Sequence, residues 1–159
     1  MRAQRRAPCA GSWALRFPGF TLITQNVDGL HERAGSIGVQ RLHGSIWDVG
    51  CWRGCAGVPH RWPDATVPFR ELPPRCPSCG GPLRPGVVWF GEVLDADTFE
   101  RCVEACTCDV FFTVASTSAV VYPAAGLVGE AHRSGAMTVE INRRPRPPPR
   151  CGRGGRRAG

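Results

Sequence analysis

Short apolar runs that end in polar clusters are the main pattern along this chain. The first run, residues 20–24 (FTLIT), contains strand-forming side chains and breaks at once into the polar segment QNVD at 25–28. Residues 28–34, closed by Gly35, have the length of one or two helical turns. We therefore expect a buried strand that leads into a polar loop and a short helix.

A strand, a helix and a second strand are predicted in the second half. Residues 109–115 (DVFFTVA) form a continuous apolar run typical of a parallel strand buried on both faces. After Pro123, apolar side chains recur at intervals of three and four residues as far as Ala131, and Gly135 is placed to end this helix. Residues 136–141 (AMTVEI) resemble another buried strand. This order predicts a βαβ unit of a parallel sheet.

Polar side chains follow each of the three predicted strands. They are QNVD after the first strand, STS at 116–118 after the second, and Asn142 after the third. In open parallel sheets, ligands bind beyond the carboxyl ends of the strands. We therefore expect these side chains to line a crevice.

Two close cysteine pairs carry the most specific chemical signal. Residues 50–85 are rich in Pro, Gly, Cys and Trp and sustain neither a helical nor a strand period. A zinc ion bound by four thiolates would organise this segment in place of an apolar core, and four cysteines leave no open coordination position for catalysis. Four reduced cysteines that merely lie close remain the alternative. The predicted ligands of one structural zinc ion are Cys51, Cys55, Cys76 and Cys79.

Three further cysteines occur near a predicted helix at residues 97–107. Cys102 and Cys106 have helical spacing, and Cys108 precedes the second predicted strand. We interpret all three as small buried hydrophobic residues.

Charge separates the body of the chain from its end. The net charge is +7, and residues 143–159 contain seven arginines and no acid. The remainder is neutral, so a nucleic-acid partner is not expected, and the Arg/Pro/Gly tail is predicted to be disordered. No apolar run is long enough to span a membrane. Residues 1–19 are left unassigned; they lack a secretory signal, and a cytoplasmic location is preferred to a mitochondrial one.

Two other motifs allow two interpretations each. His43, in the segment LHG, is either a structural imidazole or a general base, whose usual pKa of about 6.5 suits proton abstraction near neutral pH. Residues 87–90 (VVWF) lie between Gly86 and Gly91 and predict an apolar strand. That strand is either buried structure or an edge that binds a peptide.

Six segments occur in the order and approximate spacing of the sirtuins, which are NAD-dependent protein lysine deacylases. They are TQNVDGLH, LHG, the cysteine pairs, RPGVVWFGE, STSAVVYPAA and VEIN, over residues 20–142. GVVWFGE and VVYPAA most resemble the bacterial and mitochondrial branch that includes desuccinylases. The resemblance implies an α/β fold, with an incomplete Rossmann-like parallel sheet over residues 20–49 and 86–142 and a small zinc-binding module inserted at 50–85.

The resemblance also implies a role for each motif. The position of His43 is that of the general base, which activates a ribose hydroxyl so that the acyl group moves to ADP-ribose after nicotinamide leaves. The partners implied are NAD as co-substrate and acylated lysine peptides or proteins. The matched positions are Gln25, Asn26 and Asp28 at the nicotinamide ribose, Ser116, Thr117, Ser118 and Asn142 on the phosphate and adenosine side, and Val88, Trp89 and Phe90 on the strand that pairs with the peptide.

The sequence departs from the sirtuin pattern in three places. A glycine-rich loop of the type Gly-Ala-Gly-x-Ser, which would bind pyrophosphate through its amides, does not occur before Phe20. Ser116 stands where the family usually has glycine, and the arginine-rich tail follows Asn142 in place of a last strand. We therefore expect a partial chain with weakened NAD binding. The alternative function is a non-catalytic zinc-binding module, or pseudoenzyme, that binds peptides.

Overall fold

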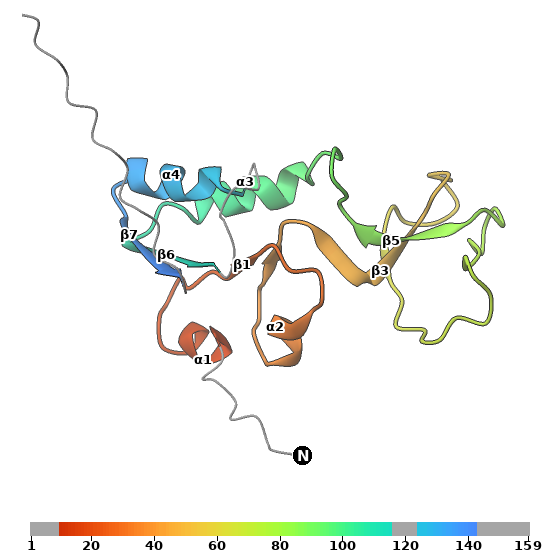
Figure 1. The fold of residues 1–159 in the computed structure, drawn as a ribbon, viewed down its shortest axis with the longest axis horizontal. Helices are drawn as coiled ribbons and strands as arrows, with labels where there is room; N and C mark the ends of the chain where they lie inside the picture. The colour runs from red at the N-terminus through yellow and green to blue at the C-terminus, as the bar shows by residue number, and fades with distance from the viewer. Residues whose placement is uncertain (1–9, 116–123, 143–159) are drawn as a thin grey trace, which may run out of the picture. The chain divides into compact units, whose positions relative to one another are not determined.

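The computed structural model describes residues 10–115 and 124–142 of the chain (Figure 1). They belong to two compact units, Met1–Thr107 and Cys108–Gly159, each of which is described by itself. No helix within the described ranges has the length and apolar character needed to cross a bilayer.

The first unit begins with short elements. Helix α1 (Ala10–Ala14) lies in the segment that the sequence pattern leaves unassigned. Strand β1 (Ile23–Thr24) pairs in parallel with β2 (Gln40–Arg41), so the strand predicted at 20–24 is correct in place but shorter than expected. The predicted helical turn is confirmed as α2 (Leu30–Arg33), and Gly35 follows it with a φ of 93°.

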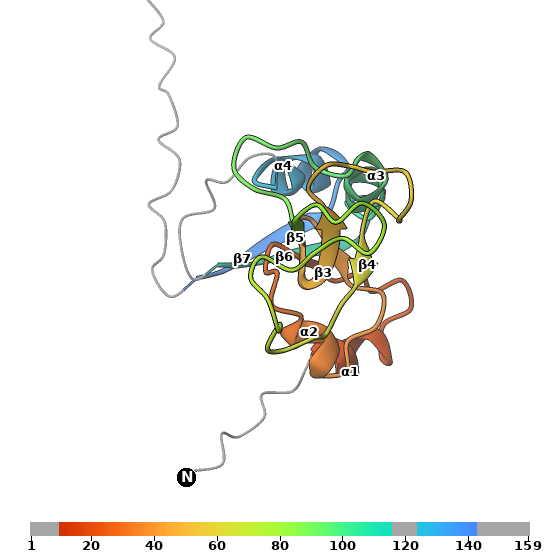
Figure 2. The same ribbon diagram turned by 90° about the vertical axis from the view of Figure 1, so that its right-hand side faces the viewer.

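A three-stranded antiparallel sheet forms the other half of this unit. Its order is β4 (Trp62–Pro63), β3 (Gly44–Cys51) and β5 (Leu83–Val87), seen side by side in Figure 2. Within residues 50–85 the strands are limited to the end of β3, the two residues of β4 and the start of β5, which agrees with the lack of a sustained period in this segment. Glycines occupy positions of close approach in the sheet: a Cβ on Gly86 would lie 2.7 Å from the Asp48 Cβ, and one on Gly50 would lie 2.7 Å from the His60 carbonyl oxygen.

Helix α3 (Ala96–Glu104) confirms the helix predicted near residues 97–107. Asp95 caps its first turn by accepting a hydrogen bond of 2.9 Å from the backbone amide of Thr98. The helix packs against β2. Cys102 and Cys106 are fully buried, as expected of small apolar side chains, whereas Cys108, in the second unit, is half-buried.

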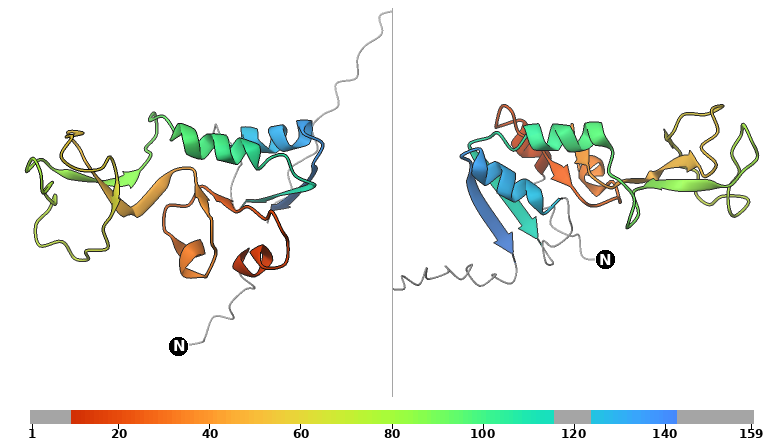
Figure 3. Two further views of the ribbon diagram at one scale, coloured as in Figure 1. Left: turned by 180° about the vertical axis from the view of Figure 1, so that it is seen from behind. Right: turned by 90° about the horizontal axis from the view of Figure 1, so that it is seen from above.

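The second unit is a βαβ arrangement, as predicted. Strand β6 (Val110–Ala115) runs parallel to β7 (Met137–Asn142), and α4 (Gly126–Arg133) lies between them in sequence and packs against both (Figure 3). Leu127 and Ala131 are buried on α4, in agreement with the predicted helix period. Pro123, the predicted first position of this helix, lies outside the described residues.

The prediction that both strands of this unit are buried on two faces is wrong. Val114 is 76% exposed and Met137 is 61% exposed. In the described part of the unit, the sheet has two strands and one helix packs against it. Apolar side chains that point away from that helix therefore have no described element of this unit to cover them.

Candidate functional site

His43 lies in the turn between β2 and β3. Its carbonyl oxygen accepts a hydrogen bond of 3.0 Å from the backbone amide of Val88, which follows directly after β5. The side chain is half-buried, and burial lowers the pKa of His43 below its usual value of 6.5. The imidazole is therefore neutral near pH 7 and able to accept a proton.

The polar loop after β1 is fixed against β3. The Ile46 amide donates a hydrogen bond of 3.0 Å to the Val27 carbonyl oxygen, and the Trp47 indole Nε1 donates one of 2.8 Å to the Asp28 carbonyl oxygen. Gly29 has a φ of 69°, and a Cβ there would lie 3.1 Å from the Trp47 ring. These contacts hold the loop beside the segment that carries His43.

The three predicted cofactor residues of this loop differ in their surroundings. The Asp28 carboxylate accepts a hydrogen bond of 3.0 Å from the Leu30 amide, so it is partly used in forming the start of α2. Gln25 and Asn26 are exposed, and neither side-chain amide has a hydrogen-bond partner among the described residues. Their donors and acceptors are therefore available to a ligand.

The remaining predicted cofactor residues belong to the second unit. Ser116, Thr117 and Ser118 lie outside the described residues. The backbone of Asn142 ends β7 and pairs with Ala115, the residue before Ser116. The register thus brings the carboxyl ends of two parallel strands together, as the sequence pattern predicts.

The predicted substrate strand is wrong in its extent. β5 ends at Val87, and Val88 continues the chain to a turn at residues 89–92, which closes with a hydrogen bond of 3.0 Å from the Glu92 amide to the Trp89 carbonyl oxygen. The Glu92 carboxylate also accepts a hydrogen bond from the Trp89 amide, so this amide is not free to extend the strand. Within the turn, Trp89 is 51% exposed and Phe90 is 98% exposed.

The four predicted metal ligands converge at one point. The sulfur atoms of Cys51, Cys55, Cys76 and Cys79 all lie within 4.8 Å of one another. Two of the sulfur pairs are 3.6 Å apart, close to the separation of about 3.8 Å that zinc–sulfur bonds of about 2.3 Å give in a tetrahedron. This donor set fits a single structural zinc ion.

Hydrogen-bonded backbone turns fix the positions of the cysteines in the cluster. The amide of Gly54 donates to the Cys51 carbonyl oxygen at 3.0 Å, and that of Gly80 donates to the Cys76 carbonyl oxygen at 2.9 Å. The backbone amide of Cys55 lowers the pKa of Cys51 to about 6, whereas burial raises the pKa of Cys55 to about 12. Some thiols therefore ionise readily, and binding of a cation displaces the protons of the others.

Residues 12–123 match the Sir2 family. This chain belongs to the Sir2 family. It is 52% identical over 126 residues to the NAD-dependent protein deacylase of Aquifex aeolicus, an alignment that covers 79% of this chain and 51% of that protein. It is 48% identical over 124 residues to NAD-dependent protein deacylase 2 of Pyrobaculum aerophilum, covering 78% of this chain and 48% of that protein.

Solved structures give the same result for the fold. A Sir2 homologue in complex with NAD has a TM-score of 0.68 and 44% sequence identity, over 77% of this chain and 46% of that one. Sir2Af2 bound to a myristoylated histone peptide has a TM-score of 0.61 and 36% identity, over 79% of this chain and 53% of that one. The sirtuin resemblance and the α/β fold class are thus confirmed. The chain spans about half the length of the curated relatives it matches.

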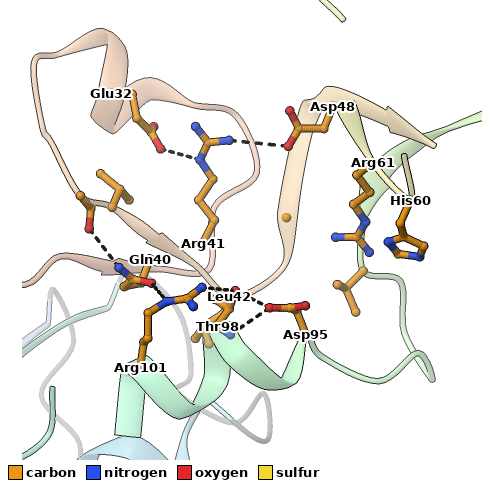
Figure 4. A pocket seen from close by; sticks show the side chains of 14 residues that line it. Glu32, Gln40, Arg41, Leu42, Asp48, His60, Arg61, Asp95, Thr98 and Arg101 are labelled. Carbon is orange, nitrogen blue, oxygen red and sulfur yellow. Dashed lines mark hydrogen bonds and ion pairs between the residues drawn. The ribbon is translucent and has the colours of Figure 1, made fainter. Parts of the chain in front are cut away.

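A cavity of about 610 Å³ adjoins the His43 turn of this sirtuin chain (Figure 4). Leu42 and Gly44, the two neighbours of His43, line the cavity, but His43 itself does not. Many of its charged groups are already paired: Arg41 lies 2.5 Å from the Glu32 carboxylate, and Arg101 donates to the Gln40 side-chain oxygen at 3.2 Å. The cavity therefore neighbours the candidate site without containing its predicted base.

Arg84 forms an ion pair in this sirtuin that the apolar pattern of the sequence does not predict. Its guanidinium binds both oxygens of Glu92, at 2.6 and 2.9 Å, and lowers the pKa of that carboxyl to about 2. The available signal in the sequence is the segment RPGVVWFGE, in which an arginine and a glutamate flank the exposed aromatic residues. A prediction based only on the apolar residues of this segment does not identify the pair of Arg84 and Glu92.

Proposed function

We propose that this chain carries part of the active site of an NAD-dependent protein lysine deacylase. His43 acts as the general base, Gln25, Asn26 and Asp28 contact the nicotinamide ribose, and Ser116, Thr117, Ser118 and Asn142 serve the phosphate and adenosine side. Val88, Trp89 and Phe90 contact the acylated peptide. Cys51, Cys55, Cys76 and Cys79 hold a structural zinc ion.

The hydrogen bond between His43 and Val88 is the observation that carries this proposal. It fixes the backbone of the proposed base beside the backbone of the proposed substrate segment, at a donor–acceptor distance of 3.0 Å. Lowering of the His43 pKa by burial adds to this support, since a base must be unprotonated at the working pH. The segment of the proposed base and the segment proposed to bind the peptide are therefore in direct contact.

NAD supplies the ribose that accepts the acyl group and the nicotinamide that leaves. The part of this chain in the reaction is to hold the ribose with the exposed amides of Gln25 and Asn26 and to take a proton from a ribose hydroxyl at His43. A relative supports the choice of ligands: a Sir2 structure that contains a p53 peptide and NAD is 33% identical to this chain. A reducing compartment such as the bacterial cytoplasm suits a site built from thiolates, and we include that location in the proposal.

Release of nicotinamide tests the proposal. The purified full chain is incubated with NAD and either an acetyl-lysine or a succinyl-lysine peptide, and nicotinamide is measured against the His43→Ala variant. Peptide-dependent release by the wild type that is lost in the variant supports the deacylase function, and the better of the two peptides identifies the acyl group. Equal background release by both proteins contradicts it.

A peptide-binding zinc module is the second candidate function. The exposed aromatic residues of the 89–92 turn and the cysteine cluster lie in the same compact unit, at the two ends of β5. This module would bind acyl-lysine peptides with equal affinity in the wild type and in His43→Ala, and without turnover. Measuring peptide affinity beside nicotinamide release separates the two functions.

A further inference from the structure

Four groups from three parts of the first unit surround the guanidinium of Arg84. It forms two hydrogen bonds with the Glu92 carboxylate, at 2.6 and 2.9 Å, and a third with the Val87 carbonyl oxygen at 3.0 Å. Its central carbon lies over two indole rings, 4.9 Å from the ring centroid of Trp89 and 5.4 Å from that of Trp52. Arg84 therefore combines hydrogen bonds with cation–π contacts, and we call Arg84, Val87, Glu92, Trp89 and Trp52 the Arg84 clamp.

One end of the clamp fixes the 89–92 turn. The Trp89 amide donates a hydrogen bond of 3.0 Å to the Glu92 carboxylate, and the Glu92 amide returns one of 3.0 Å to the Trp89 carbonyl oxygen. Arg84 binds the same carboxylate, so the ion pair is linked to the shape of the turn. Phe90, at its tip, is left almost completely exposed.

The other end of the clamp lies beside the metal cluster. Trp52 directly follows the metal ligand Cys51, and its amide donates a hydrogen bond of 3.0 Å to the Pro82 carbonyl oxygen. In the sheet register, Cys51 pairs with Leu83, the residue before Arg84. The side-chain contacts of Arg84 thus extend from Trp52, the residue after the first metal ligand, to the aromatic turn.

We propose that Arg84 is a positioning residue, which holds the 89–92 turn in the shape that contacts substrate by joining it to Trp52 beside the metal ligand Cys51. The inference rests on the proposed function only for the statement that this turn contacts an acylated peptide. Lysine cannot replace arginine in this role. Its ammonium is a point charge, which cannot bind both carboxylate oxygens in a fixed plane as the guanidinium does.

Hydrogen exchange tests the inference without any need for turnover. Exchange of the Trp89 and Glu92 amides is measured by mass spectrometry in the zinc-loaded full chain for the wild type, Arg84→Lys and Glu92→Gln. Both substitutions are expected to speed exchange of these amides about tenfold, because each weakens the ion pair and Arg84→Lys also weakens the contacts with the two indole rings. Zinc content and the protection of β3 are expected to stay as in the wild type.

A matched control is available in the same unit. Glu71 pairs with Arg75 at 3.1 Å in a similar exposed ion pair that does not involve the turn. Glu71→Gln should leave exchange at residues 89–92 unchanged. Equal exchange in the wild type and Arg84→Lys, with zinc retained, overturns the inference. If Arg84→Lys loses zinc, Glu92→Gln decides in its place.

Substrate affinity provides the readout that a purely structural role would not affect. Arg84→Lys should raise the KM for an acyl-lysine peptide, or its Kd where turnover is absent, about tenfold while leaving kcat unchanged. A fall in kcat with an unchanged KM contradicts the positioning role. If the wild type binds no acyl-lysine peptide, the proposed function fails, whereas the exchange result still decides whether Arg84 holds the turn.

Discussion

Gly44 lies so close to Gly86 that a Cβ at position 44 would be 2.0 Å from the Gly86 carbonyl oxygen. Gly44 also has a φ of 72°, in the left-handed region that favours glycine. It follows His43 directly and pairs with Val87 in the sheet. The close contact between these glycines therefore sets the separation between the proposed base and the end of β5.

We predict that Gly44→Ala lowers the free energy of unfolding by more than about 3 kcal/mol, because backbone strain and a steric clash with β5 act together. Urea denaturation of the zinc-loaded protein measures the change. Gly38→Ala is the matched control, since Gly38 has a φ of 64° and no atom within 4 Å of the added Cβ. Strain alone should cost this variant about 1 kcal/mol. Equal losses in the two variants would show that the clash has no effect.

The pH dependence of catalysis should report the lowered pKa of His43. Burial disfavours the charged imidazolium, so the neutral base persists as the pH falls below 6.5 and is lost only at the lower folded-state pKa. The same shift favours folding above 6.5, and this contribution disappears as the pH falls through the folded value. We expect kcat/KM for the acyl-lysine peptide to decline on the acid side with an apparent pKa below 6.5.

His43→Ala should reduce kcat/KM at least about 100-fold, the usual contribution of a general base. His132→Ala, on the exposed surface of α4, serves as the control and should behave as the wild type. An acid limb that persists unchanged in any active His43 variant would assign the ionisation to another group. Circular dichroism of each variant checks that the fold is intact.

Removal of one thiolate should release the metal. We predict one zinc ion per chain in the wild type, none in Cys76→Ser, and normal content in Cys108→Ser, because Cys108 is a half-buried cysteine outside the cluster. Metal analysis measures the content, and thermal unfolding with and without a chelator measures its effect on stability. Retention of zinc by Cys76→Ser, or unfolding that is indifferent to chelation, would contradict the tetrathiolate site.

The sequence predicts elements well where one local period dominates. The four-residue spacing of Leu127 and Ala131 identifies α4, because helix period is a local property of the sequence. The spacing of the cysteine pairs identifies the metal cluster for the same reason. β3 is not predicted, since its partners are far away in sequence and glycines interrupt its apolar pattern. Pairing across such distances depends on the fold rather than on neighbouring residues.

The candidate site shows the same limit. His43 and the cysteines are found from motif and spacing, whereas the shape of the segment that follows β5 is not. Its apolar residues favour a strand, but the Glu92 carboxylate takes the Trp89 amide and turns the chain. One polar side chain three residues away thus overrides the strand preference of the segment.

Asp95 provides a last test, at the start of α3. Its carboxylate accepts hydrogen bonds from the Thr98 amide at 2.9 Å and from the Thr98 hydroxyl at 2.6 Å, and these bonds lower the pKa of Asp95. Asp95→Ala should therefore lower the free energy of unfolding by about 1 kcal/mol. Asp97→Ala removes the same charge from the first turn of the helix without removing the cap, and should cost only a few tenths of that amount.

The pH dependence of this difference distinguishes a charged cap from a neutral one. Because the folded-state pKa of Asp95 lies below the ordinary value of 3.8, its stabilisation is complete above that value and declines as the pH falls through the lower folded-state pKa. Thermal unfolding of the wild type and Asp95→Ala over this acid range should show the two curves converge. If the difference in stability between the wild type and Asp95→Ala stays constant to the lowest pH, the hydrogen bonds to Thr98 do not depend on the carboxylate charge.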